Sequence, residues 1–286
     1  MDPGQHATLT VAPVAEGAPA PESATRRPLS GRRRGAWTRG ASGVLGFLVL
    51  WEVVARGHLL ARDVLPPASD TLVRAATLLV DPAFLHEVRA TLVASLIGYV
   101  IALAIAVPAG LLLGLSDRLY AATSTVVELL RPLPPVGLVP LMVLVAGQGW
   151  VMKATVVALG CVWPLLINTI HGVHCTDSTA RATARSFGWS PVTVARRVVW
   201  PSAVPSILTG VRITVSVALI LCIGAEFIGG STTGLGSWLL QQSLLPSGID
   251  AVCAGVIVAG VLGLLVNALV NRLESRFAAW ARREES

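Results

Sequence analysis

The feature that most constrains this chain is a series of continuous apolar runs, each long enough to cross a bilayer. Hydrocarbon about 30 Å thick requires roughly 20 apolar helical residues. Of the 286 residues, 53% are hydrophobic and only 13% are charged, whereas a soluble domain carries roughly 25% charged residues. Runs that are continuous rather than alternating exclude a transmembrane barrel. The composition also excludes an ordinary soluble enzyme, a coiled coil and a disordered scaffold, and it predicts an all-α membrane protein.

Six segments are predicted to be transmembrane helices. They cover approximately residues 41–57, 91–114, 121–146, 151–171, 205–229 and 251–271. The membrane domain is therefore expected over 41–275. A disordered cytoplasmic tail is expected over 1–40, which is rich in proline, alanine, glycine and arginine, and a second cytoplasmic tail over 276–286. Most of the 22 lysine and arginine residues lie in these tails or in the loop after the fourth segment, so the positive-inside rule places both termini in the cytoplasm.

A run of prolines interrupts the third segment, where the sequence reads Arg131-Pro132-Leu133-Pro134-Pro135. Proline removes a backbone donor and breaks the helical ladder. A membrane tolerates such a break only where protein or a wet cavity satisfies the freed carbonyls. We therefore expect a broken helix whose break faces other helices. Because ionisable residues inside apolar runs are functional candidates, Arg131 is expected either to attract an anion or to stabilise the bundle.

Glu226 lies late in the fifth segment and precedes a glycine-rich stretch that contains Gly234 and Gly236. This carboxylate is expected to form part of an outer gate, to pair with a second copy of the chain, or to serve the structure alone. The glycines indicate a flexible or closely packed re-entrant segment. Glu52, near the outer end of the first segment, is expected to be interfacial.

A polar stretch over residues 173–204 separates the fourth and fifth segments on the predicted cytoplasmic side. It is too short to form a core of its own, so it must pack on the membrane domain or on a partner. Three interpretations remain open: a solvated connector, a DNA-binding helix-turn-helix, and a docking element for a cytosolic partner. The absence of a third helix and the attachment to two spans argue against DNA binding, and we favour docking.

Local signals within this stretch predict two short helices. Asp177 is expected to cap the first helix, and Gly188 to end it in the left-handed conformation. Ser190 and Pro191 are expected to start the second. Pro201 and Pro205 are expected to stop that helix before the fifth span.

These residues resemble the coupling-loop signature of ABC importer permeases, whose pattern is Glu-Ala-Ala-x3-Gly followed by a variable segment and late prolines. The positions that match are Ala184, Gly188, Pro201, Pro205 and Arg212. Ala182 stands where the family usually has glutamate, and Thr183 stands where it has alanine. A carboxylate contact to the ATPase is therefore missing, and the detailed docking chemistry is expected to differ.

The resemblance covers most of residues 65–275. Arg131–Pro135, Trp163–Thr169 and the pairing of Glu226 with Gly234–Gly236 are similar to the nitrate, sulfonate and taurine branch. It implies the type I ABC importer permease fold with six transmembrane helices. By that resemblance the ATPase-coupling residues are Asp177, Ala182, Ala184, Arg185, Phe187, Gly188 and Pro201. Candidates for the pathway or gate are Arg131, Asn168, Glu226, Gly234 and Gly236.

The function implied by the resemblance is import of a small anion, such as an aliphatic sulfonate, taurine or nitrate, by alternating access. The implied partners are a cytosolic ATPase dimer that holds ATP and Mg, a second permease subunit (a homodimer), an extracytoplasmic substrate-binding protein and the lipid bilayer of the cell membrane. No nucleic acid is implied, and no cofactor or metal on this chain. His171 and His174 have helical spacing for a metal, but no further ligand cluster accompanies them.

Two alternatives stay open for the function. A vitamin precursor or another small organic solute is the alternative substrate, because similar permeases carry such compounds. A secondary transporter is the alternative from another class, and it would show inverted repeats and intramembrane ion ligands. The sequence contains no GxxxxGK[ST], GxSxG or HExxH motif, so we expect neither ATP hydrolysis nor another enzymatic activity on this chain.

Overall fold

Every regular element is helical in residues 30–57, 64–246 and 248–281, which the computed structural model describes. The helices are α1 (Ser30–Arg56), α2 (Ala68–Leu78), α3 (Pro82–Leu115), α4 (Asp117–Leu130), η1 (Pro135–Leu138), α5 (Val139–Ala146), α6 (Trp150–His174), α7 (Ser178–Ser186), α8 (Pro191–Val194), η2 (Ala195–Val199), α9 (Trp200–Gly229), α10 (Leu235–Ser243) and α11 (Ile249–Ala281). Contacts divide the chain into two compact units, Met1–Val49 and Leu50–Ser286. The second unit holds every helix from α2 onward, and the predicted all-α class is confirmed.

Four helices of the described part are long and apolar enough to cross a membrane. They are α3, α6, the continuous run Pro191–Gly229 that ends in α9, and α11 up to Glu274. The bent pair formed by α4 with η1 and α5 raises the number to five if it counts as one span. Helix α1, which contains the first predicted span, does not meet the same criteria in its described residues. The described residues therefore give four or five of the six expected spans.

The core of the second unit lies where α6 packs between α3 and α9. Its buried side chains include Ala102 and Ala106 from α3, Cys161 and Leu165 from α6, and Cys222 from α9. Small residues allow the helices to approach closely, as is common for helix pairs in membranes. This layer connects the two ends of the domain.

The predicted break in the third segment is confirmed. Helix α4 ends at Leu130, and the direction of the chain changes by 76° before it continues through η1 and α5. The break faces α6, because a Cβ placed on Gly160 would lie only 3.1 Å from Pro135 Cγ. Val136 packs against the central core from the same turn. The prolines thus direct the chain into the bundle.

Helices α1 and α11 extend into the ranges expected to be cytoplasmic tails. Helix α1 begins at Ser30, inside the stretch for which we expected a disordered tail. Residues 1–29, which make up most of that tail, lie outside the described residues. Helix α11 continues to Ala281, and residues 282–286 also lie outside them. Glu52 sits near the end of α1, where its carboxylate accepts hydrogen bonds from the backbone N–H of Ser69 at 3.0 Å and from Arg56 Nε at 2.5 Å.

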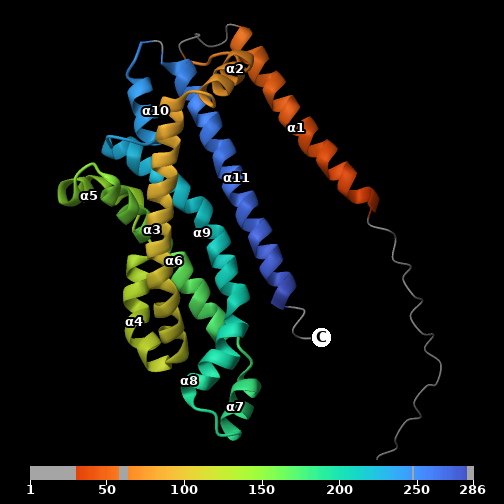
Figure 1. Ribbon diagram of the computed structural model, residues 1–286, viewed down its shortest axis with the longest axis vertical. Helices are drawn as coiled ribbons and strands as arrows, with labels where there is room; N and C mark the ends of the chain where they lie inside the picture. Colours follow the sequence, from red (N-terminus) through yellow and green to blue (C-terminus); the bar gives the residue numbers. More distant parts are fainter. Residues whose placement is uncertain (1–29, 58–63, 247, 282–286) are drawn as a thin grey trace, which may run out of the picture. The chain divides into compact units, whose positions relative to one another are not determined.

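The connecting segments gather at two opposite ends of the second unit (Figure 1). Helices α7 and α8 lie at the end where α6 finishes and α9 begins, whereas α2 and α10 lie at the other. Each group carries residues that the sequence marked as functional candidates.

Candidate functional site

Helix α7 is a separate short helix that is capped at both ends. The carboxylate of Asp177 accepts a hydrogen bond from the backbone N–H two residues later, at 2.8 Å. At the other end Gly188 has a φ of 78°. Its N–H donates to Arg185 O at 2.9 Å, and the N–H of Trp189 donates to Ala184 O at 3.2 Å. These two bonds form a Schellman motif, and the predicted cap and stop are both confirmed.

The segment around α7 is attached to the end of α6 and the start of α9 rather than free in solution. The Arg181 guanidinium donates to the carbonyl of Val173 in the last turn of α6. Ala184 of α7 is buried, and Val199 packs in a small apolar cluster with Val173. A displacement of α7 therefore acts directly on α6 and α9.

The expected stop at Pro201 and Pro205 is wrong. The helix that starts at Pro191 continues through both prolines to Gly229. A π-helical turn, Ala195–Val199, precedes Pro201 and shifts the hydrogen-bond register there. The Ser202 hydroxyl donates to Val198 O at 2.8 Å. In membrane helices such π turns and hydroxyl groups satisfy the backbone that prolines leave unpaired, so the helix tolerates both residues.

Large apolar side chains project from this segment. Phe187 is 78% exposed and Val192 is 76% exposed, and Arg185 and Ala182 are exposed on α7. An exposed aromatic residue surrounded by polar groups marks an interaction surface more often than a solvated loop. We call residues 177–199 the coupling segment.

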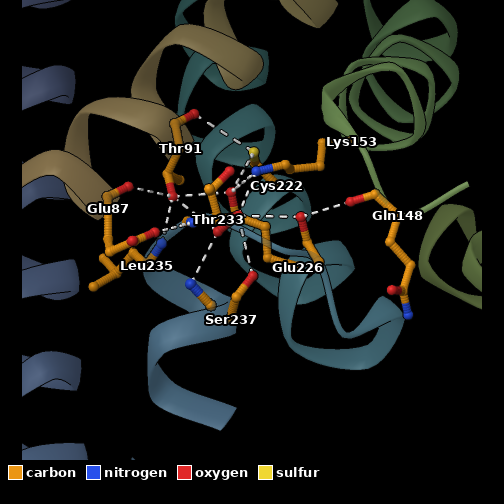
Figure 2. A network of polar contacts seen from close by, with 12 residues as sticks. Glu87, Thr91, Gln148, Lys153, Cys222, Glu226, Thr233, Leu235 and Ser237 are labelled. Carbon is orange, nitrogen blue, oxygen red and sulfur yellow. Dashed lines mark hydrogen bonds and ion pairs between the residues drawn. The ribbon is translucent and has the colours of Figure 1, made fainter. Parts of the chain in front are cut away.

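A buried ion pair lies at the opposite end of the domain (Figure 2). Lys153 Nζ, from the first turn of α6, is 3.1 Å from Glu226 Oε1, near the end of α9. The two side chains are 2% and 0% exposed. Lys153 also donates to the carbonyl of Thr233 at 2.6 Å. Two charges removed from water in this way require further hydrogen bonds to be tolerated.

The carboxylate of Glu226 receives those bonds from two other elements. The hydroxyl of Thr91 in α3 lies 2.8 Å from Glu226 Oε2, and the backbone N–H of Gly236 donates to the same oxygen at 2.9 Å. Thr91 Oγ1 in turn accepts from the N–H of Leu235 at 2.7 Å. The N–H of Gly234 donates to the carboxylate of Glu87. The network therefore joins α3, α6 and α9 to the start of α10.

The glycines of the re-entrant segment are required by its close approach to this carboxylate. A Cβ on Gly234 would lie 2.1 Å from Glu226 Oε1, and a Cβ on Gly236 would lie 2.2 Å from Ile223 O. Gly234 also has a φ of 121°, which side chains rarely adopt. Of the two expectations for this segment, close packing describes it. Of the roles left open for Glu226, its ion pair with Lys153 of the same chain supports the structural one.

Three members of the network were not identified from the sequence. Lys153 lies at the edge of the fourth apolar run in the sequence, and the structure buries it in α6. Thr91 and Glu87 carried no signal, because a lone threonine or glutamate in the first turns of a long helix is ordinary. A charge of each sign inside two neighbouring apolar runs is the signal that pairs Lys153 with Glu226.

The remaining candidates lie apart from both groups. Arg131 follows the last residue of α4, and Asn168 lies on α6, where its Nδ2 donates to Pro164 O at 2.8 Å. Both side chains line a single cavity of about 400 Å³. The predicted site residues thus form three separate groups: the coupling segment, this cavity and the Lys153–Glu226 network.

Comparison with known proteins agrees with this arrangement. The family described as "Binding-protein-dependent transport system inner membrane component" matches residues 106–279. The chain belongs to this family. The match begins within α3 and includes the coupling segment, the cavity and most of the buried network. Family members of this kind are permeases, and the expected permease subunit of an ABC importer is confirmed.

Three relatives carry more specific names. The taurine transport permease TauC of Escherichia coli is 30% identical and matches 82% of this chain and 86% of its own length. The aliphatic sulfonates transport permease SsuC of Bacillus subtilis is 26% identical over 91% of this chain and 92% of its own. The bicarbonate transport permease CmpB of Synechococcus elongatus is 28% identical over 85% and 87%. This permease therefore falls in the predicted branch.

A solved structure supports the fold. The MetNI methionine ABC transporter, in an inward-facing conformation, aligns with a TM-score of 0.59 and 18% identity. The alignment covers 68% of this permease and 95% of that chain. The likeness confirms the importer permease fold for the part of the chain that aligns.

Proposed function

We propose that this permease imports a small oxyanion, of the class that includes aliphatic sulfonates, taurine and nitrate. Relatives in the same branch are named for aliphatic sulfonates, taurine and bicarbonate, and these solutes share a compact anionic head with several oxygens. A guanidinium beside a break inside the membrane domain supports the same class, because it attracts such a head. A vitamin precursor stays the alternative substrate.

The working complex we propose has two copies of this permease, a cytosolic ATPase dimer and an extracytoplasmic binding protein. It lies in the cell membrane with both termini in the cytoplasm, as the distribution of basic residues favours. ATP and Mg would be held by the ATPase subunits. The observation that carries this proposal is the coupling segment, a capped helix with Phe187 78% exposed at the end where α6 and α9 meet.

Transport would proceed by alternating access. Closure of the ATPase dimer would displace the coupling segments, and each segment would move α6 and α9 of its own chain. The solute needs only a difference in affinity between the inward and outward states for the cycle to be vectorial. No covalent step on this chain is required.

The test is substitution of Gly188 by glutamate. Its φ of 78° strains any side chain, and the added charge lies within the surface that would enter the ATPase. We expect the permease to fold and elute normally, while the ATPase subunit no longer co-purifies and uptake stops. Phe187→Ala tests the same surface without backbone strain.

Matched controls separate docking from folding. Gly147 also has a positive φ, 71°, and lies in open space, so Gly147→Glu adds a strained, charged residue outside the coupling segment and should leave ATPase co-purification intact. Val80 is as exposed as Phe187, at 78%, and Val80→Ala should have no effect. Uptake by the Gly188→Glu complex at normal ATPase occupancy would refute the docking role of this segment.

A further inference from the structure

Two cavities of the membrane domain meet at Arg131. The first, of about 400 Å³, lies between the break after α4 and helices α6 and α9, and Trp163 and Asn168 line it. The second, of about 230 Å³, lies between α4 and the inner end of α6, where Glu128 and His171 line it. Arg131 and Ile167 line both. These two side chains therefore form the partition between the cavities.

Arg131 is available to a ligand. Within the part of the chain that the structure describes, no salt bridge involves this guanidinium. A cation at this depth in a bilayer is costly unless it pairs or faces water. The fork of N–H donors on a guanidinium fits the oxygens of a sulfonate, carboxylate or bicarbonate in a bidentate manner.

The rest of the first cavity suits the remainder of such a solute. Asn168 Nδ2 donates to Pro164 O at 2.8 Å, which fixes the orientation of the amide on the cavity wall. Trp163, Leu133 and Val217 add apolar surface to the same cavity, which suits the short carbon part of such a solute. A volume of about 400 Å³ is at the small end of ligand pockets, which run from about 300 to 1,000 Å³.

We propose that Arg131, Trp163 and Asn168 form a binding subsite for the anionic head of the solute, halfway along the transport path. This subsite rests on the proposed function, and it adds the place in this chain where the anion is held. The second cavity continues from it toward the inner end of α6. Glu128 stands one turn before Arg131 on the same helix, at a spacing that allows side-chain contact. This carboxylate can take the guanidinium when the solute leaves.

The test measures whether a cysteine at the partition reacts faster with an anionic than with a cationic reagent. It does not require the natural solute. Ile167→Cys is made in a background that carries Cys175→Ser and Cys253→Ala, where the two remaining cysteines, Cys161 and Cys222, are 0% exposed. The purified complex is labelled with sulfonatoethyl methanethiosulfonate or with its trimethylammonium analogue. Mass spectrometry gives the two rates at the new cysteine.

We expect the anionic reagent to be favoured over the cationic one, relative to their rates with a free thiol. Arg131→Gln should reduce this preference by about tenfold, which corresponds to about 1.4 kcal/mol. Arg118→Gln removes an exposed arginine from the same helix and should leave the preference unchanged. An excess of methanesulfonate should slow labelling, whereas neutral dimethyl sulfone should not.

A charge preference that Arg131→Gln leaves unchanged would overturn the subsite, as would protection by dimethyl sulfone. If Arg131→Gln fails to elute as a folded complex, Arg131→Lys is used instead. Lysine keeps the charge, so the preference for the anionic reagent should persist, but it lacks the bidentate fork, so protection by methanesulfonate should weaken; unchanged protection would overturn the subsite. Uptake of taurine by the full complex is measured in parallel. Anion uptake without a charge preference refutes only the subsite, whereas a charge preference in a complex that imports no anion supports the subsite and refutes the proposed substrate class.

Discussion

Substitution of Glu226 by glutamine should destabilise the membrane domain far more than its conservative chemistry suggests. The amide keeps the shape of the side chain and one oxygen that can accept from Gly236. It removes the negative charge 3.1 Å from Lys153 Nζ. Lys153 is 1% exposed, so its ammonium would be left in a buried setting with only the carbonyl of Thr233 as a partner.

The magnitude follows from the burial of the pair. Removing one member of a buried ion pair costs about 3–5 kcal/mol, because the remaining charge is uncompensated. At roughly 2–4 °C of melting temperature for each kcal/mol in a domain of this size, the expected shift is about 10 °C downward. The double variant Lys153→Met with Glu226→Gln carries no unpaired charge. It should therefore be more stable than Glu226→Gln alone, which makes the two effects strongly non-additive.

A thiol-reactive dye provides the assay in the Cys175→Ser, Cys253→Ala background, since the remaining Cys161 and Cys222 are 0% exposed and become reactive on unfolding. Glu274→Gln is the matched control. Glu274 faces Arg212 at 4.0 Å, and the arginine side chain is 54% exposed. Such a pair contributes less than about 1 kcal/mol, so its loss should shift melting only slightly. A Glu226→Gln variant that melts with the parent, or single effects that add in the double variant, would refute the coupling.

Two further predictions concern local backbone structure. Asp177→Ala removes the cap of α7 and should cost about 1 kcal/mol locally, so hydrogen exchange should accelerate within residues 178–186 and nowhere else in the domain. Gly234→Ala places a Cβ 2.1 Å from Glu226 Oε1 at a φ of 121° and should cost more than about 2 kcal/mol. Gly149→Ala, where a Cβ meets open space, should leave thermal melting of the domain unchanged.

Local signals in the sequence predicted the end of a helix correctly where the backbone conformation of one residue determines that end. The prolines after Arg131 end α4, and Gly188 ends α7, because neither depends on distant partners. The prolines at 201 and 205 gave the wrong expectation for a related reason. Their effect is cancelled by the π turn before them, and no residue pattern announces a π turn.

The buried network shows what a linear pattern cannot supply. Lys153 and Glu226 are 73 residues apart in sequence, and neither charge identifies the other. Whether a charge at the edge of an apolar run is buried depends on the residue at which the helix starts, and helix ends vary by one or two residues between assignments. The number of spans is hard to predict from the sequence for a similar reason. Helix α1 does not meet the criteria for a span in its described residues, and α4 and α5 count as one span only if the 76° bend between them is accepted.

The helices that join the two ends of this permease are packed too closely to move independently. A Cβ on Gly172 of α6 would lie 2.9 Å from Ala203 O of α9, a Cβ on Gly210 would meet Asn168 at 2.9 Å, and a Cβ on Gly160 would lie 2.2 Å from Leu221 Cδ1. Contacts of this kind occur both near the end of α6 and farther along the α6–α9 pair. Sliding one helix past the other would require all three to separate. Displacement of the coupling segment should therefore reach the wall of the Arg131 cavity as a movement of both helices together.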